Sequence, residues 1–305
     1  MTRRRLGGLL AGMLLACGGG PPPPASRVDG IVGTRARALR DGGLSVAGES
    51  LDDALLLAIL DDPRVPELVD LELFDNALTA AGVRTLLTHA KTAQLRVLHL
   101  GSNPIGDDGV IALAESPRLT TIERLEVGAT AATAAGIGAL ARSPHAAALR
   151  LVQVGYQPLG DPGAVALVAL RAGALLVKQA AIGGPGARAL LAGTAAGSLV
   201  LDDNPLGAGG LIGLAALAPE MTALSLQRTA LGAADAAALA ALPAPALRAL
   251  SLTYAPLGDD GVRALLGAPW FPTLRTLDLT GTRATTAAYA AARAAWGERP
   301  GFSGG

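Results

Sequence analysis

The stretch that decides the fold reads Leu95-Arg-Val-Leu98-His-Leu100-Gly-Ser-Asn103-Pro-Ile105. Within it, Leu98 and Leu100 alternate with Val97 and His99, and this period of two predicts a short strand with one buried face. Asn103 follows at the point where the chain must turn. Because so short a strand cannot bury its leucines alone, the rest of the chain has to provide neighbouring strands of the same kind.

The same spacing returns along most of the chain, for example in Leu68…Leu71-Glu-Leu73-Phe-Asp-Asn76 and in Leu274…Leu277-Asp-Leu279. The position of Asn103 recurs every 23 to 27 residues, and it is occupied in turn by Asn76, Asn103, Thr130, Gln157, Ala180, Asn204, Thr229, Ala255 and Thr282. Such a period indicates a repeat protein, in which each unit buries its apolar face against the next. We therefore expect about nine repeats over residues 66–296.

The repeated pattern L-x-x-L-x-L-x-x-N-x-L resembles leucine-rich repeats. Its continuation as Gly-x-x-x-Leu, in Gly109 to Leu113 and Gly261 to Leu265, resembles the ribonuclease-inhibitor-like subclass. The resemblance implies an α/β solenoid with a curved parallel sheet on the concave side and helices on the convex side. It also implies that the Asn amide satisfies backbone groups of neighbouring coils, a role that Thr and Gln fill in part and that Ala180 and Ala255 cannot fill.

A helix is expected after each turn, so that every unit runs strand, turn, helix. Val110, Leu113 and Ala114 recur at spacings of three and four, which predicts the buried side of such a helix. Asp107 and Asp259 fall in the expected first helical turn, where a carboxylate favours the free amides and the positive end of its helix.

The first residues predict export and lipid attachment. Three arginines precede an apolar run, Leu6 to Ala16, that is too short to span a bilayer. The run ends in Leu14-Leu15-Ala16-Cys17, which resembles the lipobox of bacterial lipoproteins. The resemblance implies that residues 1–16 are a signal peptide and that Cys17 is the lipidation site. An ordinary signal peptide with a chance cysteine, or an apolar N-terminal helix of the domain, is the alternative.

The segments on either side of the repeats are interpreted from their composition. Residues 17–26 hold the cysteine and a run of glycines and prolines, and they predict a lipidated tether without a core. Gly18, and not Asp, follows the cysteine, which by resemblance to Gram-negative lipoproteins implies sorting to the outer membrane. Residues 27–65 look like a degenerate first repeat acting as an N-terminal cap, and residues 297–305 are expected to be disordered.

Composition and motifs argue against several classes of function. The formal net charge is zero, and three of the 25 basic residues lie in the predicted signal peptide, so the chain offers no basic stripe for nucleic acid. Cys17 is the only cysteine, so no internal disulfide and no cysteine-based zinc site can form. The glycines of residues 207–213 lack the spacing of a dinucleotide fingerprint and belong to the repeat. We therefore expect no cofactor and no enzyme.

A binding partner is expected on the concave sheet, where the outward residues of each repeat form columns along the solenoid. Exposed rings and an arginine are types that concentrate binding energy at interfaces. The alternative for Tyr156 and Tyr254 is that they merely cover strand ends. The predicted partner-binding residues are Glu72, Phe74, Asp75, His99, Glu126, Gln153, Tyr156, Lys178, Gln179, Gln227, Arg228 and Tyr254.

One group of residues in the sequence could form a metal site or a charged cluster, and it consists of Glu72, His99 and Glu126. They occupy equivalent positions in three successive repeats, so parallel strands about 4.8 Å apart would set them side by side. Carboxylate, imidazole and carboxylate can hold a divalent metal or raise the pKa of the histidine. The alternative is a solvated ladder in which His99 relieves the repulsion between the two acids.

Together these features predict a lipid-anchored scaffold of the bacterial cell envelope that binds a protein or glycan partner through its concave face and performs no catalysis. Two alternatives remain open at this point. One is a regulator of the GTPase-activating or ligand-sensing type, and the other is a metal-dependent enzyme that uses Glu72, His99 and Glu126.

Overall fold

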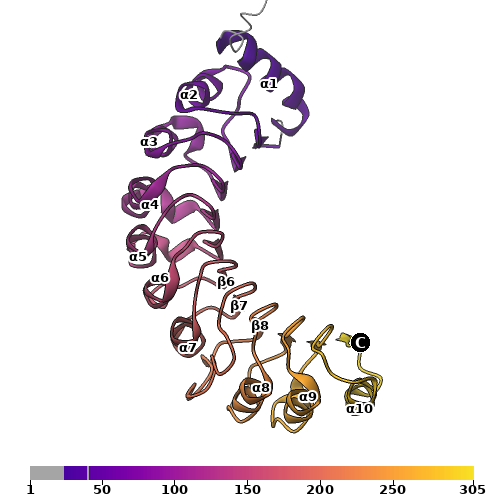
Figure 1. Ribbon diagram of the computed structural model, residues 1–305. Helices are drawn as coiled ribbons and strands as arrows, with labels where there is room; N and C mark the ends of the chain where they lie inside the picture. Colours follow the sequence, from indigo (N-terminus) through magenta and orange to yellow (C-terminus); the bar gives the residue numbers. More distant parts are fainter. Residues whose placement is uncertain (1–23, 40) are drawn as a thin grey trace, which may run out of the picture.

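The computed structural model describes residues 24–39 and 41–305, and it shows a curved solenoid with the sheet on the inside of the curve and the helices outside (Figure 1). The described residues form one parallel sheet of eleven strands in chain order. The strands are β1 (Gly43–Ser45), β2 (Asp70–Glu72), β3 (Val97–His99), β4 (Arg124–Glu126), β5 (Leu151–Gln153), β6 (Ala174–Leu176), β7 (Ser198–Val200), β8 (Ala223–Ser225), β9 (Ala249–Ser251), β10 (Thr276–Asp278) and β11 (Phe302–Ser303).

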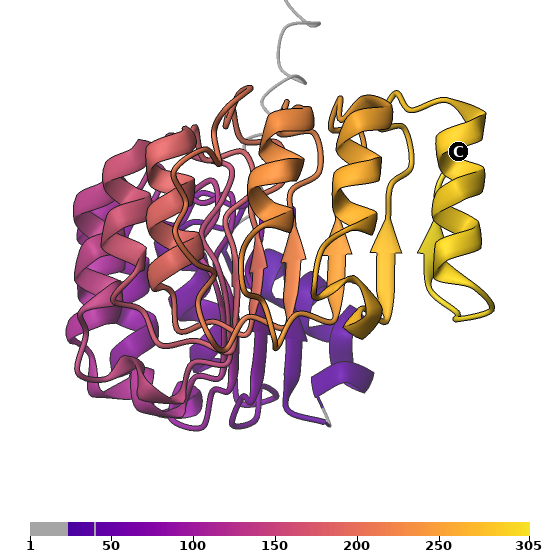
Figure 2. The same ribbon diagram turned by 90° about the horizontal axis from the view of Figure 1, so that it is seen from below.

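Helices return the chain on the convex side and form a second layer beside the strands, which Figure 2 shows as parallel arrows. They are α1 (Pro24–Leu39), α2 (Asp53–Asp61), α3 (Ala80–Thr88), α4 (Gly106–Glu115), α5 (Ala134–Ala141), α6 (Gly160–Leu167), α7 (Gly184–Gly193), α8 (Ala233–Ala240), α9 (Gly258–Leu266) and α10 (Thr286–Trp296). The predicted α/β solenoid is confirmed. None of the helices in the described ranges is both long and apolar enough to cross a bilayer.

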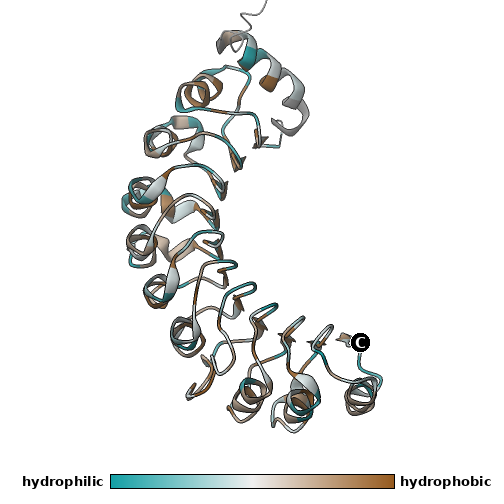
Figure 3. Cartoon of the chain, in the orientation of Figure 1, coloured by the Kyte–Doolittle hydropathy of each residue, from teal (hydrophilic) through white to brown (hydrophobic). Residues whose placement is uncertain are grey.

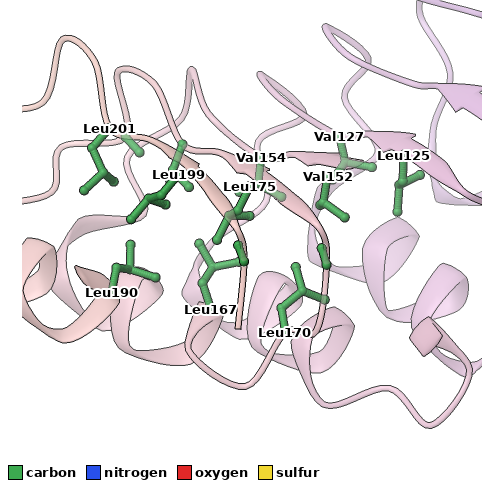
Figure 4. Close-up of a cluster of buried hydrophobic side chains, with 14 of the residues drawn as sticks. Leu125, Val127, Val152, Val154, Leu167, Leu170, Leu175, Leu190, Leu199 and Leu201 are labelled. Carbon is green, nitrogen blue, oxygen red and sulfur yellow. The ribbon is translucent and has the colours of Figure 1, made fainter. Parts of the chain in front are cut away.

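The core lies between the two layers. The middle residue of each three-residue strand points inward, and Leu98 pairs with Leu71 on one side and Leu125 on the other. Leu98, Val110 and Leu113 are all fully buried, which confirms the faces predicted from the sequence. In Figure 4, leucines and valines from successive strands point towards leucines of the neighbouring helices. The hydropathy colouring shows polar residues in the turns along the inner rim (Figure 3).

Buried amides tie neighbouring coils together at the Asn103 position. The Nδ2 of Asn103 donates to the carbonyls of Leu73 and Leu100, and its Oδ1 accepts from the amide of Leu78. Gln157 makes the same set of bonds to Thr130, Ala132, Val127 and Val154. The expectation that Gln replaces Asn only in part is therefore corrected, because the longer side chain reaches the same donors and acceptors.

The N-terminal part differs from the predicted tether. The predicted signal peptide (residues 1–16), the lipidation site Cys17 and the tether up to residue 23 lie outside the described residues. Helix α1 begins at Pro24, so the last three residues of the predicted tether are helical. Proline favours the first position of a helix, and Val28, Ile31 and Val32 bury their side chains in the core cluster. Strand β1 and helix α2 then continue the solenoid as a first coil.

One coil lacks its predicted helix. Residues 201–222, between β7 and β8, contain turns but no helix. The coil carries Gly207, Gly209 and Gly213, all with φ between +74° and +84°, outside the helical region. Asp235 of α8 fixes the loop, since its carboxylate accepts from the amides of Gly209 and Leu211 at 2.8 and 2.9 Å. The prediction that every unit ends in a helix is therefore wrong for this unit.

The C-terminal tail is ordered, so the predicted disorder of residues 297–305 is wrong. Phe302 and Ser303 form β11, which pairs with β10. The Phe302 ring packs against Trp296, with ring centroids 5.8 Å apart, and Arg293 lies over its face. The indole of Trp296 donates to the carbonyl of Arg299. An apolar anchor and an open sheet edge together hold the tail in place.

Candidate binding surface on the concave face

The sheet register sets the predicted polar residues of the first repeats side by side. Glu72 pairs with His99, His99 with Glu126, and Glu126 with Gln153. Each follows a buried strand residue, so each points away from the core by the two-residue period of a strand. The sequence predicted this column correctly because the repeat spacing fixes the register.

His99 binds one of its two acidic neighbours. Its Nδ1 lies 3.0 Å from Oε2 of Glu126, whose Oε1 accepts from Nε2 of Gln153 at 2.7 Å. The hydrogen bond that the His99 imidazole donates to Glu126 raises the pKa of His99, burial opposes this, and the charges of Glu72 and Asp70 add to the increase. The contact with Glu126 therefore stabilises the charged form of the imidazole relative to the neutral form.

The same contacts bear on the metal hypothesis. No hydrogen bond or ion pair joins Glu72 to His99 in the described part of the chain, while both oxygens of Glu126 already have partners. Nowhere in the part of the chain that the structure describes do three His, Cys, Asp or Glu side chains come together in a way that would hold a metal ion. Of the two acids beside it, His99 pairs with Glu126.

Asp70 extends this acidic region, although it is not among the predicted partner-binding residues. It lies two residues before Glu72 and so shares its face of β2. Its Oδ1 is buried and has no hydrogen-bond partner among the described residues. Burial raises the pKa of Asp70, and the charge of Glu72 raises it further. The two-residue period alone placed Asp70 beside Glu72, but its burial depends on the neighbouring coils.

The middle of the concave face changes character. Leu151, Leu176 and Val200 point outward here and are only half-buried. In the first repeats the column of Leu151 holds Asp70, Val97 and Arg124, and the column of Leu176 and Val200 holds Glu72, His99 and Glu126. A shallow hollow of about 350 Å³ begins at Val200 and lies over β7 to β10. Its lining includes the small side chains of Ser198, Ser225 and Ser251, together with Asp278.

Two of the predicted partner-binding residues, Lys178 and Arg228, form ion pairs with acids outside the predicted set. Lys178 Nζ lies 3.3 Å from Oδ2 of the buried Asp202, which also accepts from Ser225. Arg228 donates from Nη2 to Asp203 at 2.8 Å, and this pair holds the pKa of Asp203 below its usual range. The two pairs lie in neighbouring columns. Lys178 and Arg228 therefore join successive coils by ion pairs and also form part of the concave surface.

The three predicted rings are exposed. Phe74, Tyr156 and Tyr254 have exposed fractions of 44%, 46% and 57%. Tyr254 lies against Gly281 of the next coil, and Phe74 lies against Gly101. These two rings therefore cover part of the next coil and still remain accessible to a partner. The structural role and the binding role expected from the sequence are compatible.

The turn residues share an unusual backbone. Asp75, Tyr156, Gln179, Arg228 and Tyr254 all have φ between +46° and +62°, a left-handed conformation that is uncommon for residues other than glycine. The equivalent turn in every repeat imposes it, so these side chains leave the rim at a fixed angle. The repeat spacing placed these residues in one column, but it did not reveal the left-handed conformation of their backbone.

The twelve predicted residues do not form one pocket. The register gathers Glu72, His99, Glu126 and Gln153, and the turns set Arg228 beside Tyr254. Of the twelve, only Gln227 lines the hollow over β7 to β10. The arrangement offers a broad surface with an acidic part, an apolar part and a hydroxyl-lined part, and such a surface suits an extended ligand.

Comparison with known proteins supports the repeat. A family model described as Leucine Rich repeat matches residues 94–114 and 245–266. No curated protein matches the chain. A solved structure of the Rad7 and Elc1 complex in yeast is 15% identical over 88% of this chain and 79% of that chain, with a TM-score of 0.47. The mouse RP105/MD-1 complex is 14% identical over 80% and 46%, with a TM-score of 0.40. Likenesses at this level carry no argument about function.

The two matched repeats lie near opposite ends of the sheet, and the coils between them share its register. The ribonuclease-inhibitor-like subclass is not distinguished by the match. The chain is an α/β solenoid, and two of its coils match the family model of the leucine-rich repeat.

Proposed function

We propose that this protein is a lipid-anchored scaffold of the bacterial cell envelope that binds a protein partner through its concave face and performs no catalysis. The observation that carries the proposal is the set of half-exposed rings, Phe74, Tyr156 and Tyr254, along the rim of an open concave sheet. In a chain with 3% aromatic residues, rings left at the surface of a broad regular face favour a binding role.

The anchor rests on the sequence. The apolar run that ends at Cys17 supports processing before the cysteine and acylation of its sulfur and amine, and Gly18 supports delivery to the outer membrane. Several acyl chains, at about 0.8 kcal/mol per buried CH₂, would make attachment effectively permanent. The metal-dependent alternative gains no support from His99, which contacts Glu126 alone of the two predicted acidic ligands.

The anchor is tested by expressing the full chain and a Cys17→Ser variant in a related Gram-negative bacterium. We expect the parent to begin at an acylated Cys17 in mass spectra and to fractionate with the outer membrane. The variant should lose both properties. Unprocessed protein in the cytosol would overturn the lipoprotein proposal and favour the cytoplasmic regulator.

The binding face is tested by placing a photo-crosslinking amino acid at position 156. Val165 on α6 provides the matched control, because it is 58% exposed but lies on the convex side. We expect one dominant protein adduct from position 156 and none of that mass from position 165. Equal adducts from both positions, or none from either, would contradict a concave protein interface.

A further inference from the structure

The concave face is divided by charge. Over β2 to β4 it presents the carboxylates of Asp70, Glu72 and Glu126, with Arg124 and His99 as the cations of the same columns. Over β6 and β7 the same two columns hold alanine, serine, leucine and valine. The acidic part and the apolar part are therefore separate sections of one continuous surface.

The carboxylates of β2 lack donors. Glu126 is bound by His99 and Gln153. Asp70 keeps a buried oxygen without any hydrogen-bond partner. The backbone carbonyl of Glu72 accepts from the amide of Val46, but its carboxylate accepts no hydrogen bond from the described residues. A buried polar atom without a partner costs free energy. A donor brought by a partner would recover that cost, and a charged donor would do so most strongly.

The apolar part lacks a cover. Leu176 and Val200 stand in the column of Glu72 and His99, where neither side chain is fully buried. No other segment of the described chain crosses this part of the sheet, as the open inner side of the curve in Figure 1 shows. An apolar side chain laid there would remove both residues from water.

Resting on the proposed scaffold function, we propose that the concave face binds an extended polypeptide segment that crosses the strands, placing an ammonium or guanidinium group at Asp70 and Glu72 and an apolar side chain on Leu176 and Val200. Charge complementarity selects a cationic group at one end. The uncharged leucine and valine select an apolar group at the other.

The sheet fixes the separation of the two groups. From β2 to β6 there are four strand spacings of about 4.8 Å, or about 19 Å in all. An extended chain advances about 3.3 Å per residue, so the two side chains should be about six residues apart. The length of a lysine or arginine side chain allows a spacing of about five to seven.

The test uses a displayed library of random twelve-residue peptides, selected on the purified full chain. We expect the selected peptides to carry a lysine or arginine about five to seven residues from an aliphatic or aromatic residue. Asp70→Asn combined with Glu72→Gln should weaken their binding by about tenfold or more. The matched control, Asp108→Asn combined with Glu115→Gln on α4, removes two exposed convex carboxylates and should change binding by less than about twofold.

A second variant, Leu176→Ser, tests the apolar end and should remove the preference for the apolar residue while leaving the basic one. If the double variant does not fold, Glu72→Gln alone replaces it, since Glu72 makes no hydrogen bond that the change would break. Selected peptides without a basic residue, binding that ignores Asp70 and Glu72, or no selected peptide at all would overturn the inference. So would binding to a glycan array in place of peptides.

These outcomes are separable from failure of the scaffold function. A protein adduct from position 156 together with failed peptide selection would leave the concave interface standing and remove only the cationic anchor. If the selected peptides bind but do not reduce crosslinking at position 156, the ligand lies on β2 to β7. That result would contradict the part of the proposed function that rests on Tyr156.

Discussion

At the residue scale, His99 and Glu126 form an ion pair on an open surface. Their side chains are 25% and 20% exposed, and the hydrogen bond between them raises the pKa of His99 above its ordinary value. A group whose folded pKa is raised stabilises the fold fully below its unfolded pKa, about 6.5. That stabilisation is lost as the pH rises through the folded pKa.

Glu126→Gln is therefore expected to lower the free energy of unfolding at pH 5 and to have little effect at pH 9. The loss should stay below about 1 kcal/mol, because solvent screens a partly exposed pair. Urea unfolding at the two pH values measures it, and the imidazole pKa followed by NMR should fall in the variant. An effect of equal size at both pH values would show that the pair is not its cause.

Leu98 and His99 are adjacent but face opposite sides of β3. Leu98→Ala should cost about 2–5 kcal/mol, because it empties part of a fully buried site. His99→Ala should cost less than about 1 kcal/mol, because it removes a surface ion pair. Chemical denaturation of both variants at pH 7 compares them. Equal losses would mean that the inward and outward faces of the strand are wrongly assigned.

The alternation of residues predicted which side chains face inward, because the two-residue period of a strand is local. The close contact between coils is not local. A Cβ at Gly155 would collide with the backbone of Lys178, and the buried oxygen of Asp70 depends on neighbouring strands. A single repeat therefore contains no information about either feature.

At the element scale, an aspartate in the first turn of one helix caps the next helix. Asp107 of α4 accepts from the amide and hydroxyl of Thr133, both at 2.7 Å, and from the amide of Gly136 at 3.0 Å. Asp259 bonds Thr285 in the same way. The sequence placed both acids in a first turn correctly, but their donors belong to the following repeat. The helices stand side by side, so the next N-terminus is within reach.

Asp107→Ala should cost about 1–2 kcal/mol, because it leaves donors of the α5 N-terminus without a partner. Burial raises the pKa of Asp107, but the bonds from Thr133 and Gly136 outweigh it and hold the pKa below its usual value. The stabilisation is therefore present above about pH 4 and is lost as the pH falls through the folded pKa. Thermal unfolding of the variant at pH 7 and pH 2.5 measures both effects.

Asp108→Ala is the matched control, since Asp108 lies in the same helical turn and is exposed. We expect it to change stability by less than about 0.5 kcal/mol. A loss as large as that of Asp107→Ala would assign the effect to the charge of the first turn and not to the bonds between repeats.

At the scale of the whole molecule, the row of helices is interrupted once within the described part. The coil of residues 201–222 places turns where a helix packs in the other repeats, so α7 and α8 lack the packing that joins other neighbouring helices. Arg188 reaches across to the carbonyl of Gly210 at 2.7 Å, and the sheet continues from β7 to β8. The sequence predicted the solenoid, because its leucines recur at the same positions along the repeats. It did not predict the missing helix, because glycines also begin helices in other repeats.

This interruption should weaken the coupling between the two parts of the solenoid, since each repeat is stabilised mainly by its neighbours. Leu250→Ala, which truncates a buried side chain of β9, is therefore expected to speed amide hydrogen exchange in β8 to β10 more than tenfold, and in β3 to β5 by clearly less. Leu98→Ala in β3 provides the reverse experiment and should speed exchange mainly in β2 to β5. If either variant accelerated both parts equally, the solenoid would unfold as one cooperative unit and the turns of residues 201–222 would couple the coils as well as a helix does.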